Sequence, residues 1–445
     1  MEMFKRSMDP PGPGGWSRVS RPRAWPIDPI RDSHFLARKF GDVVRYRALG
    51  RQYYQFTHPD ACYELLATKA HQFHATIRSQ TALIYAPNEW ASTPAFQHGI
   101  PLPSFSPDEL SAFADSMVHL TRRKLDLGQL RIFNIHEVLS DISLASVAEL
   151  LFGREIRPHA AEMREVLVAL NAVRQRRSWV PKIWPPRVHV FERGQGGKAM
   201  SYLRQLVADL VQRRRLHPDH RKDWLSRLVD ACDAAGIQSL ERDGIPDRAL
   251  AILLMGRDAI SHVLTWAVYL LTKHPAVQNN VAREIHAICV SDRVTSQQIQ
   301  LLAETERVLN ETLRLHPATY VVAREAIEVA EISGYQVPRR ALCFVPVDVM
   351  HRDPRWFDSP EDFRPGRSFS DGVNETARRA FLPFGWGPQT CILRQFVMLG
   401  GALILAAILQ NYSVLSVDGF PEPQMDPTTP WQKNHGPFVQ LRRRR

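Results

Sequence analysis

The chain has 445 residues, of which 44% are hydrophobic and 23% are charged, as is ordinary for a globular protein with a large core. Its formal net charge of +11 fits a basic protein from an arginine-rich proteome, or a face that docks an acidic partner protein or steers an anionic substrate. No recognised nucleic-acid module appears, so a nucleic-acid ligand is not expected.

The N-terminal part predicts an irregular leader followed by a hairpin and a helix. Residues 1–30 are polar and rich in Pro and Gly. Strand-like alternation within 35–70 ends near Thr57, and His58 then begins a helix. We expect the leader to precede a single domain over residues 31–445.

The next part of the chain predicts helices separated by two irregular segments. Residues 82–107 contain five prolines, a density of helix breakers that excludes a long helix. A new helix starts at Pro107, and further helices follow over 135–225. The loop 177–197 mixes Trp with Arg and Lys. It is expected to be an ordinary interhelix loop with its Trp side chains in the core, and the alternatives are a mobile lid or a membrane-surface contact.

A long apolar helix is predicted to begin at Pro246 and to end at His274, where Pro275 follows. At 1.5 Å per residue it would span roughly 40 Å, enough to cross a whole domain. Arg257 and Asp258 lie in its middle. Buried charges of this kind are costly unless they are paired or functional.

The C-terminal part predicts helices, then a strand-rich patch, then loops and a last helix. The expected order is helices at 275–290, from about Thr295 and at 303–316, strands within 321–348, a Pro-rich passage at 353–365, a Gly-rich loop at 384–388 and a helix from Cys391 onward. The whole pattern indicates a mainly α fold with a small β-rich region.

The cysteines and the apolar stretches bear on the compartment. The five cysteines are odd in number and scattered, which argues against a disulfide framework and favours a reducing, cytoplasmic compartment. No signal-peptide pattern is visible. The most apolar stretch, 397–409, is shorter than the about 20 residues that a bilayer requires. We expect a soluble protein with no transmembrane anchor.

The segment that carries the clearest chemistry is the Gly-rich loop that leads into Cys391. Gly385 and Gly387 let the backbone pass close to a flat cofactor. A helix that starts at the cysteine would direct its positive dipole end and free amides to the sulfur, which stabilises a thiolate. The alternative is a small buried cysteine near a turn.

This segment resembles the heme-binding loop of cytochromes P450, whose pattern Phe-x-x-Gly-x-x-x-Cys is matched by Phe384, Gly387 and Cys391. The resemblance covers nearly the whole chain from about residue 35. It implies the mainly α P450 fold, with heme b (iron protoporphyrin IX) bound between the long helix and the loop. It also implies that Cys391 ligates the iron as a thiolate, which favours O–O cleavage. Gly385 and Gln389 would be further cofactor-binding residues of the loop.

Three arginines and a glutamate match other parts of the family pattern. Glu311 and Arg314 reproduce its Glu-x-x-Arg motif and lie on one helix face, where they can pair. Arg367 is the candidate for the later arginine that completes the family's structural triad behind the heme. Arg324 lies where the family often places an arginine on a heme propionate. The alternatives are surface charges of little energetic worth.

The long helix resembles the family's oxygen-activating helix, but it departs from the pattern. The family sequence Ala/Gly-Gly-x-Asp/Glu-Thr-Thr is represented by Gly256, Asp258 and Ala259, so the acid is present and the alcohol is missing. Ala259 has no side-chain hydrogen-bonding group. Ser261 is a poor substitute because it lies roughly 200° around the helix. His262 is expected to be a core or surface histidine rather than a group that faces the heme.

Three other departures from the family pattern fall on cofactor-binding positions. Gln389 stands where an Arg or His commonly contacts a propionate, and Leu393 stands where a Gly normally lets the helix approach the heme. In an ungapped comparison the usual Trp falls on Pro94 and the usual Arg on His98, within a segment whose prolines break the expected helix. Together with Ala259, these departures touch propionate anchoring, electron-donor docking and proton delivery.

The sequence therefore leaves three functions open. The first is a monomeric monooxygenase that takes electrons from a separate ferredoxin and ferredoxin reductase. It would oxidise an apolar terpenoid or fatty acid in secondary metabolism. The second is a P450-fold isomerase, dehydratase or cyclase, or a peroxide-driven enzyme, that no longer activates oxygen. The third is a heme-binding sensor or an inactive scaffold.

Overall fold

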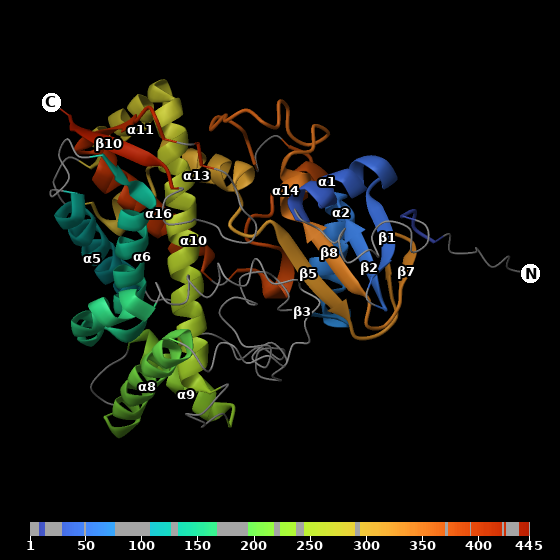
Figure 1. The fold of residues 1–445 in the computed structure, drawn as a ribbon, viewed down its shortest axis with the longest axis horizontal. Helices are drawn as coiled ribbons and strands as arrows, with labels where there is room; N and C mark the ends of the chain where they lie inside the picture. The colour runs from blue at the N-terminus through green and yellow to red at the C-terminus, as the bar shows by residue number, and fades with distance from the viewer. Residues whose placement is uncertain are drawn as a thin grey trace, which may run out of the picture. The chain divides into compact units, whose positions relative to one another are not determined.

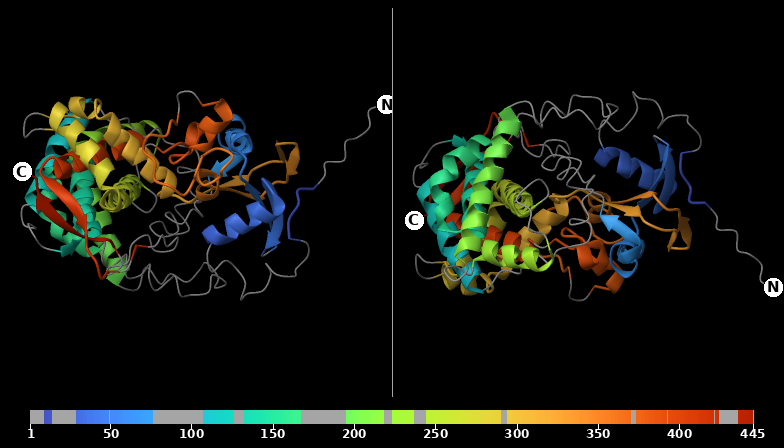
Figure 2. Two further views of the ribbon diagram at one scale, coloured as in Figure 1. Left: turned by 90° about the horizontal axis from the view of Figure 1, so that it is seen from above. Right: turned by 90° about the horizontal axis from the view of Figure 1, so that it is seen from below.

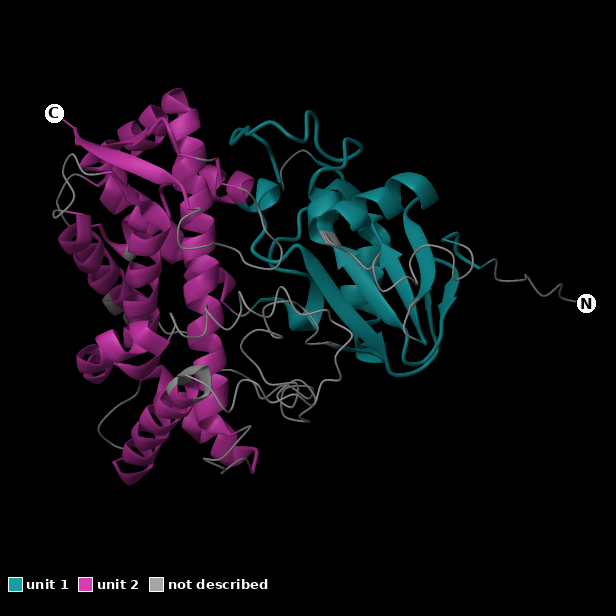
Figure 3. Cartoon of the chain, viewed as in Figure 1, with its two compact units in different colours: residues 1–83, 313–391 teal, residues 84–312, 392–445 magenta. Residues whose placement is uncertain are grey.

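The computed structural model describes residues 9–13, 29–48, 50–75, 107–125, 132–166, 195–217, 223–236, 244–289, 294–369, 373–391, 393–420, 422–423 and 436–444. The chain divides into two compact units, each built from two separate stretches of sequence (Figures 1 and 3). Unit 1 comprises residues 1–83 and 313–391, and unit 2 comprises residues 84–312 and 392–445. The units are described in turn.

Unit 1 is built on a five-stranded sheet in the order β1-β2-β8-β5-β3. Its strands are β1 (Val43–Ala48), β2 (Arg51–Phe56), β3 (Phe73–Ala75), β5 (Val321–Ala326) and β8 (Leu342–Pro346). The strands β2 and β8 pair in parallel, and the other neighbours pair antiparallel. The predicted hairpin is confirmed as β1 and β2, with Gly50 in the turn at φ +74°, where a glycine is favoured. The predicted strand-rich patch also includes the hairpin of β6 (Ala330–Ile332) and β7 (Tyr335–Val337).

Short helices surround this sheet: α1 (Pro29–Phe40), α2 (Pro59–Tyr63), α14 (Val347–His351) and α15 (Glu375–Ala380), with the helical turns η1 (Glu64–Thr68), η2 (Ala70–Gln72) and η5 (Gly387–Gln389). The predicted helix start at His58 is confirmed, because the His58 ring accepts a hydrogen bond from the Asp60 amide and Pro59 takes the first helical position. The helix α1 was not predicted from the sequence; its His34 ring contacts the Asp348 carboxylate of α14 at 2.8 Å.

One face of the sheet in unit 1 carries the main apolar core. Strand residues such as Tyr54 and Phe56 pack with Leu65 and Leu66 of η1. The same cluster contains Leu382, which immediately precedes the Gly-rich loop. The loop therefore begins at a residue that is fixed in the core.

Unit 2 is mainly helical, as expected. Its helices are α5 (Pro107–Leu125), α6 (Ile135–Phe152), α8 (Gln195–Leu216), α9 (Trp224–Ala234), α10 (Ile245–Lys273), α11 (Pro275–Ile288), α12 (Ser296–Ile299), α13 (Ala303–Leu315) and α16 (Arg394–Leu409), with the turn η4 (Arg154–His159). The last turn of α13 lies in the sequence range of unit 1. A small antiparallel sheet has the order β4 (Ile132–Asn134), β10 (Phe438–Arg443) and β9 (Tyr412–Ser416).

The central element of unit 2 is α10, the long helix that the sequence predicts. It has 29 residues, with Pro246 in its first turn and His274 at its end. It packs against α6 and α16 (Figure 1), and Figure 2 views it nearly end-on. By length and hydropathy α10 could cross a membrane, but 83% of its most apolar window is buried inside the protein. Apolar burial of this extent stabilises the unit and is the expected behaviour of a core helix.

Candidate functional site

The Gly-rich loop folds back on itself before it reaches Cys391. Gly385 has φ +76° and Gly387 has φ +75°, a left-handed conformation that is costly for any residue with a Cβ. The Cys391 amide donates to the Phe384 carbonyl at 2.8 Å, and the Thr390 amide donates to the Gly387 carbonyl at 3.1 Å. These bonds fix where the Cys391 backbone lies.

The side chain of Thr390 closes the same turn. Its hydroxyl lies 3.2 Å from the Phe384 carbonyl and 3.3 Å from the Gly385 carbonyl, to which it donates. Gln389, beside it, is exposed, and Phe384 is half-buried. The loop therefore holds its shape mainly through backbone acceptors and one hydroxyl, and the exposed amide of Gln389 brings no charge to it.

Cys391 differs from the other four cysteines in its exposure. None of the five forms a disulfide. Cys62, Cys232, Cys289 and Cys343 are buried, and burial raises the pKa of each of those thiols. Cys391 is only half-buried. Cys391 is therefore the one of the five cysteines whose side chain is open to a group from outside the protein core.

The prediction that a helix starts at Cys391 is wrong. The helix α16 begins at Arg394, with Leu393 as its N-terminal flanking residue. The amide of Cys391 is used by the turn through Phe384 and does not belong to the first turn of a helix. The Cys391 amide is therefore not one of the free amides at the N-terminus of α16.

Leu393, which replaces the expected glycine, is accommodated by a glycine on α10. Leu393 is buried, and a Cβ on Gly256 would lie 3.2 Å from its Cδ1. The same Cβ would lie 3.4 Å from Val147 of α6. Because Gly256 has no side chain, the larger residue fits between these helices of unit 2.

The buried side chain of His351 holds the residue that immediately precedes the Gly-rich loop. His351 is fully buried, its Nδ1 lies 3.1 Å from the Arg314 carbonyl, and its Nε2 accepts a hydrogen bond from the Leu382 amide at 3.1 Å. These partners require a neutral ring with the proton on Nδ1. Burial lowers the pKa of His351 from 6.5 to about 3, so the ring stays neutral at ordinary pH.

Arg314 and Arg367, two of the predicted triad residues, share an acceptor. Arg314 is fully buried and donates to the carbonyls of His351 at 2.8 Å, Pro360 at 2.6 Å and Asp362 at 3.1 Å. Arg367 donates to the Asp362 carbonyl at 3.4 Å. Glu311, the third member, is fully buried one helical turn before Arg314. The two arginines thus hold the chain segment that precedes the loop, through its backbone.

Arg324 is a buried cation without an acidic partner among the described residues. It is 7% exposed, and its Nη1 donates to the Ala323 carbonyl at 2.9 Å. Its buried Nε has no hydrogen-bond partner in the described part of the chain. Burial lowers the pKa of Arg324 to about 10. A guanidinium in this state fits a carboxylate such as a heme propionate, which would satisfy its remaining donors.

The middle of α10 places an ion pair where the sequence predicts functional charge. The Arg257 guanidinium contacts both the Asp258 carboxylate and the Ser140 hydroxyl of α6. The Ser261 hydroxyl donates to the Asp258 carbonyl at 3.2 Å. Both charges were predicted from the sequence, but their partner Ser140 was not, because only the packing of α6 on α10 brings Ser140 to Arg257. The methyl group of Ala259 adds no polar atom here.

Some predicted features have a clear outcome, and others fall outside the described residues. His262 is buried, as expected for a core histidine. His98 and Pro94, with the whole Pro-rich segment, lie outside the described residues, as does the loop 177–197 apart from its last residues in α8.

Comparisons with known proteins show what most of the chain is similar to. A family model described as Cytochrome P450 matches residues 28–435. The chain is 26% identical over 407 residues to cyclooctatin synthase of Streptomyces melanosporofaciens, with 87% of each protein covered. It is 26% identical over 336 residues to cytochrome P450 4V2 of Mus musculus, which covers 70% of this chain and 64% of the mouse protein.

A solved structure supports the fold. The retinoic acid-bound cyanobacterial CYP120A1 superimposes with a TM-score of 0.78 at 21% identity, over 98% of this chain and 99% of the other. At this identity the similarity concerns the fold alone, and it confirms the predicted mainly α fold with a small β-rich region.

Replacement of His351 by Gln should flatten the acid side of the stability profile. The folded protein needs a neutral ring, and the pKa of His351 is lowered in the folded state, so its contribution is present above pH 6.5 and is lost as the pH falls toward 3. Between pH 7.5 and 5 the wild type should lose about 2 kcal/mol of unfolding free energy that His351→Gln does not lose. Urea unfolding at both pH values measures the difference, and an equal loss in the variant would contradict this role.

The two loop glycines should differ in their tolerance of alanine. Gly385→Ala should add only the left-handed strain of about 1–2 kcal/mol, since no atom of the described residues lies within 4 Å of the new Cβ. Gly387→Ala should cost more, because its Cβ would lie 2.2 Å from the Leu66 carbonyl oxygen. Urea unfolding of both variants compares them, and equal costs would show that the contact with Leu66 does not constrain the loop.

Proposed function

Because the chain belongs to the cytochrome P450 family of heme-thiolate oxidoreductases, whose cofactor is heme b, we propose that it is a monooxygenase that inserts one oxygen atom into an apolar small molecule. The observation that supports the proposal is the Cys391 loop, in which Phe384, Gly387 and Cys391 match the family's heme-binding pattern and the cysteine is half-buried. When bound, the heme would supply the oxygen chemistry, and thiolate ligation would favour cleavage of the O–O bond.

The proposed substrate is terpenoid-like or fatty-acid-like. A supporting comparison is the relative named cyclooctatin synthase. Electrons would come from a ferredoxin and its reductase, as separate proteins. The proposed location is the cytoplasm, where a reducing environment suits five free cysteines. We propose that the enzyme acts as a monomer in secondary metabolism.

Several residues of unit 1 have separate proposed roles in binding the cofactor. In this proposal the Cys391 sulfur binds the iron, and Phe384, Gly385 and Gly387 give the loop its shape. Arg324 binds a propionate, which turns a costly buried cation into a buried ion pair. With Gln389 exposed and uncharged, Arg324 takes on more of this anchoring than it would beside a second basic residue.

On α10, Asp258 is the proposed proton-handling group. Its carboxylate is held by Arg257, which is itself held by Ser140, so its direction is fixed without the missing alcohol. The Ser261 hydroxyl is engaged with a backbone carbonyl. Proton transfer past Ala259 would therefore use ordered water or a hydroxyl of the substrate. Gly256, the third α10 residue of the family pattern, also leaves room for the Leu393 side chain.

A second candidate function follows from the same helix. Position 259 is alanine, and the Asp258 carboxylate is paired with Arg257. The described part of α10 therefore has fewer side chains for proton transfer at these positions than the family pattern. This favours, as the alternative, a P450-fold isomerase, dehydratase or cyclase, or a peroxide-driven enzyme. In such an enzyme Asp258 would act as an acid or base on the substrate itself.

Turnover with and without oxygen separates these functions. The purified protein is incubated with terpenoid and lipid substrates, with NAD(P)H and surrogate ferredoxin partners, in air and under anaerobic conditions. A monooxygenase should give a product heavier by one oxygen atom, only in air and only with reductant. Product of unchanged mass formed anaerobically without reductant would contradict it and support an isomerase or cyclase.

Arg324→Leu should change the stability of the heme-free and heme-bound protein in opposite directions. The heme-free protein should become more stable, by about 1–3 kcal/mol, because a buried cation with no acidic partner among the described residues is removed. The heme complex should lose heme faster because a propionate partner is gone. Thermal unfolding of both forms and heme transfer to apomyoglobin measure these effects, and Arg339→Leu, at a position on the connection after β7, is the control. Unchanged heme loss would exclude Arg324 as a propionate ligand.

A further inference from the structure

Trp386 occupies a distinctive place in the thiolate loop. It lies between Gly385 and Gly387, both of which adopt the left-handed conformation. Glycines leave the unbound backbone with many accessible conformations, so this stretch gains little rigidity from its own chain. The side chain of Trp386 is the only one between them and is thus the part of this stretch that other elements can hold.

The Trp386 ring is held by α2 and by α15. Its indole N–H donates to the Arg379 carbonyl at 3.2 Å. Its ring packs edge-on against Tyr63, with the ring centroids 5.8 Å apart and an interplanar angle of 70°. Contacts of this edge-on kind are attractive beyond the apolar area that they bury.

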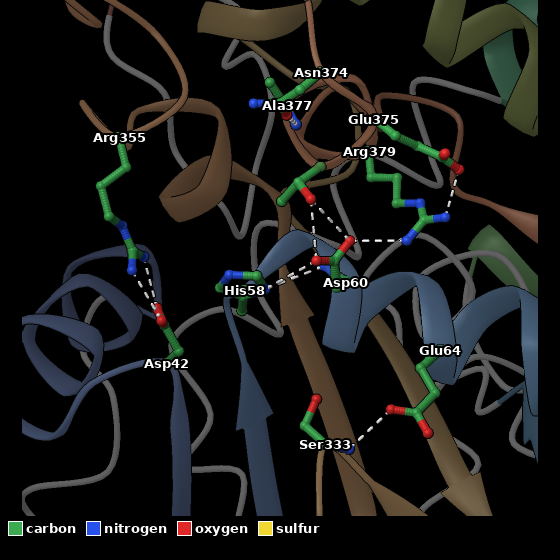
Figure 4. Close-up of polar contacts among 11 residues, drawn as sticks. Asp42, His58, Asp60, Glu64, Ser333, Arg355, Asn374, Glu375, Ala377 and Arg379 are labelled. Carbon is green, nitrogen blue, oxygen red and sulfur yellow. Dashed lines mark hydrogen bonds and ion pairs between the residues drawn. The ribbon is translucent and has the colours of Figure 1, made fainter.

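Arg379 completes the same cluster. Its guanidinium carbon lies 4.2 Å from the centroid of the Tyr63 ring, a cation–π distance. Its Nη1 donates to Asp60 at 2.8 Å and its Nη2 to Glu375 at 2.5 Å, as Figure 4 shows. Because Asp60 and Tyr63 both belong to α2, the arginine joins α15 to the helix that contacts the Trp386 ring.

The loop is also fixed immediately after Trp386. The Gly387 backbone approaches η1 so closely that a Cβ would lie 2.2 Å from the Leu66 carbonyl oxygen. The same turn then returns the chain to Phe384, whose carbonyl accepts from the Cys391 amide at 2.8 Å. A movement of Trp386 would therefore be transmitted through Phe384 and Gly387 to the cysteine.

We propose that Trp386, Tyr63 and Arg379 form a clamp that positions the Cys391 sulfur, and that Trp386 is a positioning residue for heme-thiolate ligation. The proposal rests on the proposed role of Cys391 as the iron ligand. Trp386 does not touch the sulfur in this scheme; it restrains the two-glycine stretch from which the position of the sulfur follows. Loosening the clamp should let the thiolate leave the iron more readily while the protein stays folded.

The experiment follows the ferrous–carbon monoxide absorption band that is specific to thiolate-ligated heme. Its rate of loss is measured in mild urea for the wild type, Trp386→Leu, Tyr63→Leu and Tyr63→Phe, with circular dichroism as the readout of global folding. Trp386→Leu and Tyr63→Leu should each lose the band about tenfold faster, equivalent to ~1.4 kcal/mol. Tyr63→Phe, which keeps the ring, should match the wild type.

Trp356→Leu is the matched control. Trp356 is also a half-buried tryptophan of unit 1 with an arginine nearby, since Arg355 lies 5.6 Å from its ring and His58 packs on its edge. It should leave the rate of band loss unchanged. The double variant Tyr63→Leu/Trp386→Leu should lose the band no faster than Trp386→Leu alone, because both changes break one interaction.

The outcomes separate the clamp from the proposed function. A wild-type rate for Trp386→Leu, or equal acceleration by Trp356→Leu, would overturn the clamp while leaving Cys391 as the ligand. A wild-type protein that binds heme but shows no thiolate band would overturn the role of Cys391, and the clamp with it.

Discussion

The structure depends on the placement of one sulfur atom by a loop that has little regular secondary structure. The backbone around Cys391 is held by the hydrogen bond from its amide to the Phe384 carbonyl and by two glycines in the left-handed conformation. Such a turn is easily deformed unless its neighbours restrain it. In unit 1 the restraint comes from Leu382 in the apolar core and from the close approach of Gly387 to η1.

Buried polar groups reinforce this arrangement through backbone carbonyls rather than through surface ion pairs. Arg314 directs its guanidinium to three carbonyls, and His351 joins the Arg314 carbonyl to the Leu382 amide. Burying such groups is tolerable only because their hydrogen bonds are made. Arg324 contrasts with them, since its Nε has no partner among the described residues. Under the proposed function, this buried cation would bind a propionate of the cofactor.

Those helices, strands and candidate site residues that depend on short stretches of sequence could be predicted from the sequence. Apolar content and flanking prolines located α10, alternation located β1 and β2, and the family motif located Cys391 with Arg314 and Arg367. Features set by tertiary contacts were not accessible. The start of α16 was misplaced because the Cys391 amide donates to the Phe384 carbonyl. The Ser140 partner of Arg257 and the Leu393–Gly256 contact likewise depend on packing between helices. The helix α1 was missed although Pro29 at its start, an acidic first turn and a basic last turn are local helix signals.

The most direct test of the central claim is the ferrous–carbon monoxide spectrum of the heme-loaded wild type and of Cys391→Ala, with Cys343→Ala as a buried-cysteine control. If the Cys391 sulfur ligates the iron, the wild type and Cys343→Ala will show the band of thiolate-ligated heme. Cys391→Ala will retain heme without that band. A Cys391→Ala protein that still gives the band, or a wild type that cannot take up heme when it is supplied, would contradict the claim.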